Sequence, residues 1–204
     1  MLVTSIVSLD KKRSRVLLDQ DLALVLYPGE IRQFHIQEDR ELTEEAYRQL
    51  LETVLKPRAR ERLLRTLMVS DKTERQLAEL LKREGYPPEA AEDAVSMVKR
   101  YHYIDDEAYG ARYLESQKKK KSRRALVCDM QKKGFDKELI DGLMEEASID
   151  EPAQIRELLR KKGYQPGDMP DRKQYARLAG MLARKGYSYE AISSALREPE
   201  EDFI

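Results

Sequence analysis

A glycine followed by an aromatic residue recurs three times along this chain and sets the frame of an internal repeat. The segments LLKREGYPPEAAEDAV, DMQKKGFDKELIDGLM and MLARKGYSYEAISSAL align on Gly85, Gly134 and Gly186, which are 49 and 52 residues apart. Apolar residues stand eight and four positions before each glycine and nine or ten positions after it, on one face of a helix in both directions. A repeat of this period predicts an array of similar helical units.

Each of the three glycines is predicted to end a helix, because glycine adopts the left-handed conformation of a helix C-terminus at little cost. Glutamates stand four residues later, at Glu89, Glu138 and Glu190, where the dipole at the start of a helix favours acids. A further helix precedes each pair, over about residues 58–68, 106–117 and 151–162. Gly163 and Tyr164 repeat the glycine-aromatic pattern one helix early, which leaves the framing of the third repeat open.

The N-terminal part has a different pattern. Residues 2–9, 15–18 and 22–26 are apolar runs that predict three short antiparallel strands. Pro28 suits the first turn of a short helix, Thr43 is the predicted N-cap of the next one, and Pro57 is expected to close this unit. The predicted fold class is therefore mainly α: three tandem three-helix repeats form an elongated, curved array behind a small N-terminal β-rich unit. The predicted domains are residues 1–56 for that unit, then 57–104, 105–149 and 150–204 for the repeats, the last with an acidic tail.

Charge is balanced over the whole chain but not along it. The 38 basic residues equal the 38 acidic ones, yet residues 111–133 hold nine bases against Glu115 and Asp129, a local net charge of +7. Residues 187–204 hold one base against five acids, a local net charge of −4. This polarity indicates a basic surface for an acidic partner and an acidic tail.

Several classes of protein are disfavoured by composition. Cys128 is the only cysteine, so neither an intramolecular disulfide nor a cysteine-based zinc site is expected. No stretch approaches the roughly 18 apolar residues that span a bilayer, and the N-terminus has no signal-peptide pattern. No glycine-rich phosphate loop is present. We therefore expect a cytoplasmic monomer that binds no cofactor or metal and does not contact a membrane.

The candidate binding residues are the bases of the central run. They are Lys118, Lys119, Lys120, Lys121, Arg123, Arg124, Lys132 and Lys133. Such a run is either a solvated face or a surface that binds phosphates or an acidic groove.

Two other groups of residues have both a functional and a simpler structural interpretation. Asp105 and Asp106 beside His102 could form a carboxylate-rich metal site, but an N-cap and a first-turn acid explain the two aspartates, and no third ligand is suitably spaced. Catalysis is therefore not expected. Four tyrosines could stack nucleobases, but the spacing of four between Tyr109 and Tyr113 is more typical of packing between helices. The four tyrosines are Tyr101, Tyr103, Tyr109 and Tyr113.

The central segment contains Tyr103-Ile104-Asp105-Asp106, then Ala108-Tyr109 with Tyr113, then a basic segment that closes at Lys133-Gly134. In these residues it resembles the RecX family of recombination regulators. Nearly the whole chain is similar to that family, although Ser122 stands where glycine is usual and Gly110 stands where alanine is common. The motif residues from Tyr103 to Tyr113 and Gly134 are then structural.

The resemblance implies a non-enzymatic protein that binds the RecA recombinase and its nucleoprotein filament. Such a protein curbs strand exchange, ATP hydrolysis or filament growth. DNA, single- or double-stranded, is a further partner that is expected to bind weakly by itself. The residues alone leave an alternative open, which is a DNA-binding helical regulator that acts without RecA.

Overall fold

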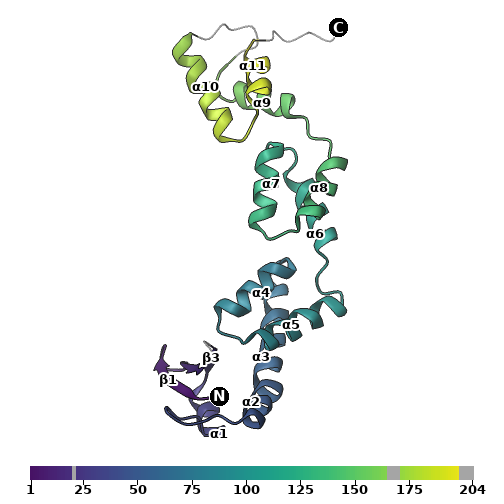
Figure 1. Ribbon diagram of the computed structural model, residues 1–204. Coiled ribbons are helices and arrows are strands. Elements are labelled where there is room, and N and C mark those ends of the chain that lie inside the picture. The colour runs from purple at the N-terminus through teal and green to yellow at the C-terminus, as the bar shows by residue number, and fades with distance from the viewer. Residues whose placement is uncertain (20–21, 165–170, 198–204) are drawn as a thin grey trace. The chain divides into compact units, whose positions relative to one another are not determined.

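The computed structural model describes residues 1–19, 22–164 and 171–197 (Figure 1). It is mainly helical, with a small sheet near the N-terminus, as the sequence predicts. The chain divides into two compact units, Met1–Asp106 and Glu107–Ile204. Four of the five acids of the expected acidic tail lie outside the described residues. Within the described ranges, no helix combines the length and the apolar character needed to cross a membrane.

The sheet is antiparallel, and its strands follow one another in chain order. It consists of β1 (Val3–Ser8), β2 (Ser14–Leu18) and β3 (Ala23–Leu26). Ser14 pairs with Leu26, which sets the register of β2 and β3. One face of β2 and β3 is buried and supplies Val16, Leu18, Leu24 and Leu26 to the core. The alternation of buried and less buried residues is what a sheet with one covered face requires.

Two helices follow the sheet, α1 (Pro28–Gln33) and α2 (Glu44–Leu50). The hydroxyl of Thr43 accepts the Ala46 N–H at 3.2 Å, which confirms the predicted N-cap. Pro57 does not interrupt the helix, because a π-helical turn at Leu51–Leu55 leads directly into α3 (Lys56–Leu67). That Pro57 closes an N-terminal unit stays a prediction. Pro57 lies in the first turn of α3, directly after the wider π turn, where its missing N–H does not break the helix.

Three-helix repeats make up the rest of the chain, as predicted. The first consists of α3, α4 (Glu74–Arg83) and α5 (Pro88–Arg100). The second consists of α6 (Asp106–Gln117), α7 (Arg123–Lys132) and α8 (Lys137–Glu146). The third consists of α9 (Glu151–Arg160), α10 (Arg172–Arg184) and α11 (Tyr189–Arg197).

The turn between the second and third helices is the same in every repeat. Gly85, Gly134 and Gly186 have φ of 83°, 82° and 91°, and the N–H of the following aromatic residue donates to a carbonyl five residues earlier. This is the helix ending that the glycine pattern predicts. Gly163 ends α9 in the same way, with φ of 75°. Gly186 is therefore the repeat glycine, and Gly163 closes the first helix of the third repeat.

The buried apolar residues form three clusters among the described residues. The sheet and the first repeat share one cluster, which extends from Val3 to Ile104. The second repeat has its own cluster around Leu126 and Met130, and the third has one around Leu178 and Leu182. These leucines and the methionine are the apolar positions on which the repeats were aligned. The four domain ranges proposed from the sequence stay predictions.

Candidate functional site

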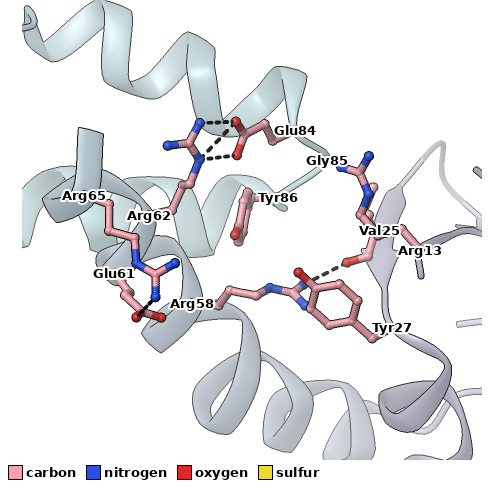
Figure 2. Close-up of a pocket in the computed structure, with 10 residues that line it drawn as sticks. All are labelled: Arg13, Val25, Tyr27, Arg58, Glu61, Arg62, Arg65, Glu84, Gly85 and Tyr86. Carbon is pink, nitrogen blue, oxygen red and sulfur yellow. Dashed lines mark hydrogen bonds and ion pairs between the residues drawn. The ribbon is translucent and has the colours of Figure 1, made fainter. Parts of the chain in front are cut away.

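A pocket of about 470 Å³ lies where the sheet meets the first repeat, and four arginines help to line it (Figure 2). Arg58 extends between the rings of Tyr27 and Tyr86, 4.9 and 5.5 Å from their centroids. Its guanidinium donates to Glu30 at 2.9 Å and to the Val25 carbonyl at 2.8 Å. Arg58 therefore joins the strand β3 and the helices α1 and α3.

The other arginines of this pocket are also paired. Arg62 pairs with Glu84 at 2.6 Å, Arg65 with Glu61 at 2.6 Å, and Arg13 with Asp10 at 2.7 Å. A guanidinium already committed to a carboxylate offers fewer donors to a ligand. The pocket thus fastens the sheet to the first repeat, and its charge is largely compensated.

The eight predicted bases of the central run divide into two sets. The inner bases, which are Lys118, Lys121, Arg123 and Lys133, bond to groups of the second repeat itself. Lys118 Nζ lies 2.6 Å from Glu115 Oε1 and Lys121 Nζ lies 2.5 Å from Asp129 Oδ2. The Asp129 hydrogen bond raises the pKa of Lys121 above its usual value, so this lysine stays charged. The Arg123 guanidinium donates to the carbonyl of Met144.

Lys133 belongs to an aromatic cluster under the inner bases. Its Nζ donates to the Tyr109 hydroxyl at 3.3 Å and lies 4.9 Å from the centroid of Tyr113. Both tyrosine rings pack against Phe135, with centroid separations of 5.1 and 6.4 Å. This favours the helix-packing interpretation of Tyr109 and Tyr113 over nucleobase stacking. Tyr101 and Tyr103, by contrast, are exposed.

The outer bases are Lys119, Lys120, Arg124 and Lys132, and all four are exposed. In the part of the chain that the structure describes, none of them forms an ion pair. Lys119 and Lys120 lie in the turn before α7, and Arg124 and Lys132 lie eight residues apart on one face of that helix. The run therefore presents four uncompensated charges instead of the eight that the sequence suggests.

Of the two aspartates of the family motif, Asp106 bonds to the middle helix of the first repeat. Asp106, the first residue of α6, accepts the backbone N–H of Glu74 at 3.2 Å and so caps the start of α4. Burial raises the pKa of Asp106 above its ordinary value. Asp105 is exposed and directly precedes α6, while Ile104 lies in the shared core and Ala108 is partly buried on α6. His102 has φ of 56° and follows the end of α5. No group of three or more residues suited to hold a metal ion occurs in the described ranges.

The second and third repeats meet in a hydrogen-bonded seam that the sequence did not reveal. Ser122 caps α7 through its Ala125 N–H bond and also donates from Oγ to the Lys185 carbonyl at 2.8 Å. The Arg123 N–H donates to Glu151 Oε1 at 2.8 Å.

The same seam holds the other end of the basic turn. Gln154 Nε2 donates to the Lys118 carbonyl at 2.6 Å, and the Tyr187 hydroxyl donates to Gln154 Oε1 at 2.8 Å. Burial raises the pKa of Tyr187, which keeps this hydroxyl protonated as a donor. The basic turn at residues 118–122 is thereby bonded at both ends to the third repeat.

The second and third helices of each repeat are joined by a short glycine turn, like those of a DNA-binding helix-turn-helix. In that motif the N-terminal residues of the later helix enter the major groove. Here those first turns carry Glu89, Glu138 and Glu190, whose charge would oppose the DNA phosphates. The geometry therefore does not favour base recognition by α5, α8 or α11.

Repeated three-helix units, repeat-to-repeat caps and a cluster of uncompensated bases define a helical-repeat protein whose features are those of a binding protein. Comparison with known proteins identifies the family. Residues 59–96 match the model described as "RecX, first three-helix domain", and residues 150–196 match "RecX, third three-helix domain". The chain belongs to the RecX family.

Individual relatives agree with this assignment. The regulatory protein RecX of Caldanaerobacter subterraneus subsp. tengcongensis is 30% identical over 96% of this chain and 98% of its own length. That of Streptomyces coelicolor is 35% identical over 71% of this chain and 80% of its own length. A crystal structure of a regulatory protein RecX aligns over 97% of this chain and 99% of its own, with a TM-score of 0.60 at 21% identity, which supports the fold.

Proposed function

We propose that this chain regulates homologous recombination and DNA repair by binding the RecA recombinase and its nucleoprotein filament. It acts in the cytoplasm without catalysing a reaction, and it lowers ATP hydrolysis and strand exchange by the filament. The family is regulatory, and the resemblance of the central motif implies RecA as the partner. The observation that carries the proposal is the set of outer bases, which are exposed and unpaired within the described part of the chain.

Uncompensated bases suit a filament because its nucleic acid presents closely spaced phosphates. Tertiary contacts hold the elements that carry these bases. Phe135 shares a core with Leu126 and Met130 of α7, and the seam fixes the turn that carries Lys119 and Lys120. A fixed turn loses less conformational entropy on binding than a mobile one, which increases affinity.

The test is charge reversal of the outer bases. Replacing Lys119, Lys120, Arg124 and Lys132 by glutamate is expected to abolish inhibition of the ATPase of the cognate RecA filament, while circular dichroism stays unchanged. The matched control reverses four other exposed bases of the second unit, which are Lys137, Arg156, Lys162 and Arg177. Full inhibition by the outer-base variant would remove this surface from the mechanism. Undiminished binding to bare DNA, with no effect on RecA, would favour the regulator that acts without RecA.

A further inference from the structure

Two helices of the second unit, like α3 of the first unit, begin without an acid in their first turn. The first turns of α4, α5, α8, α9 and α11 each carry an acid, as the helix dipole prefers. The first turns of α7 and α10 carry no acid. They hold Arg123 and Arg124 in α7, and Arg172 and Lys173 in α10. Bases at these positions are locally unfavourable, so helix stability does not explain their presence.

The C-terminal end of α10 lies against the start of α7. Ser122 Oγ donates to the Lys185 carbonyl at 2.8 Å, and a Cβ on Gly186 would lie 3.3 Å from the backbone nitrogen of Ala125. Lys185 and its neighbour Arg184 therefore lie at the seam, close in space to the turn that bears Lys119 and Lys120. In the repeat alignment these two residues match Lys132 and Lys133, a correspondence that the charge count over residues 111–133 did not include.

Both bases at the end of α10 are available to a ligand. Arg184 and Lys185 are exposed, and neither takes part in an ion pair among the residues that the structure describes. The acids nearest in the seam are already in use, since Glu151 accepts the Arg123 N–H and Asp129 pairs with Lys121. Positive charge thus continues across the seam from the second repeat to the third.

The kind of partner follows from what else is exposed. Nine large apolar side chains are classed as exposed in the described ranges, and only Tyr189 belongs to the second unit. Protein interfaces depend on buried aromatic and apolar anchors, whereas contacts to a nucleic-acid backbone need mainly bases. The second unit offers bases with few apolar anchors, so the observations favour the sugar-phosphate backbone over an acidic protein surface.

We propose that Arg184 and Lys185 join the outer bases in one surface that spans the seam and binds the phosphates of nucleic acid. This inference rests on the proposed function and assigns to the third repeat a direct part in nucleic-acid binding. The seam bonds keep the two groups of bases at a fixed spacing, so that one strand contacts both.

The test uses the full chain and a fluorescein-labelled oligonucleotide of about 30 thymidines, which reports backbone contacts without base-specific recognition. In fluorescence anisotropy, the double variant Arg184→Glu with Lys185→Glu is expected to bind about tenfold more weakly than the unmodified chain. Its plot of log affinity against log salt should be shallower by about 1.4, the value for two lost phosphate contacts on a single strand. The matched control is Arg156→Glu with Lys162→Glu, which changes net charge equally on exposed residues of the same repeat.

Equal weakening by both double variants would show a net-charge effect and overturn the inference, as would unchanged binding by the α10 variant. If glutamate disturbs the fold, the pair Arg184→Gln and Lys185→Gln is used in its place and should show the same lowered salt slope. The proposed function is tested by a different experiment, because it predicts loss of RecA inhibition when the outer bases are reversed. The α10 variant could lose oligonucleotide binding while the outer-base variant still inhibits RecA. That result would support this inference and contradict the proposed function.

Discussion

The carboxylate of Asp106 accepts the backbone N–H of Glu74 through both oxygens, at 3.2 and 3.3 Å. An equivalent bond joins Glu151 to the N–H of Arg123 at 2.8 Å. In each case the first residue of one repeat caps the middle helix of the repeat before it. The first four N–H groups of a helix have no partner within the helix, so each of these carboxylates satisfies one of them.

Replacing Asp106 by alanine is expected to lower the free energy of unfolding by about 1 kcal/mol, the usual effect of losing a helix cap. Urea unfolding followed by circular dichroism measures the change. Asp141→Ala serves as the control, because Asp141 is exposed on α8. Equal stability of the two variants would mean that the bond to Glu74 contributes nothing.

The pH dependence of stability should have opposite signs at two aspartates. Arg60 binds Asp93 through two hydrogen bonds of 2.6 and 2.7 Å and lowers the pKa of Asp93, whereas burial raises that of Asp106. A lowered pKa stabilises the fold above the unfolded value of 3.8, and this contribution is lost as pH falls through the folded value. A raised pKa stabilises the fold at low pH, and its contribution is lost as pH rises through the range above 3.8.

The measurement compares Asp93→Asn and Asp106→Asn with the unmodified chain between about pH 3 and pH 7. The stability lost in Asp93→Asn should grow with rising pH, and the stability lost in Asp106→Asn should shrink. The Asp93 effect should stay below about 1 kcal/mol, since Arg60 is 43% exposed and solvent screens the pair. Profiles of the same sign would show that burial does not control Asp106.

A comparison of two glycines separates the cost of backbone strain from the cost of a steric contact at the seam. Gly163 and Gly186 both have positive φ, at 75° and 91°, so alanine at either costs about 1 kcal/mol or more. Among the described residues, a Cβ at Gly163 would meet no atom within 4 Å, whereas one at Gly186 would lie 2.7 Å from Ser122 Oγ. Gly186→Ala should therefore lower the thermal midpoint more than Gly163→Ala. Equal losses of thermal midpoint would show that the contact with Ser122 adds no cost to the backbone strain.

Sequence predicted those features that depend on neighbours along the chain. The glycine-aromatic pairs predicted the repeat, and Thr43 caps α2 as expected. The lysines of the basic run show what the sequence could not predict. Lys118, Lys119, Lys120 and Lys121 look alike in the sequence, but Lys121 meets Asp129 only because the turn folds back onto α7. Which charges stay uncompensated is decided by tertiary contacts, and local charge counts cannot detect them.

The bonds to Gln154 offer a last prediction about that turn. Its carboxamide connects the Tyr187 hydroxyl to the Lys118 carbonyl, so Gln154→Met removes both bonds and keeps the side-chain length. Amide hydrogen exchange at Lys120 and Lys121 should rise about fivefold, the effect of losing about 1 kcal/mol of hydrogen bonding. Tyr187→Phe should give a smaller rise, because Gln154 can still bond to Lys118. Tyr189→Phe is the control, as Tyr189 is 72% exposed. Unchanged exchange in Gln154→Met would show that the turn keeps its shape without the third repeat.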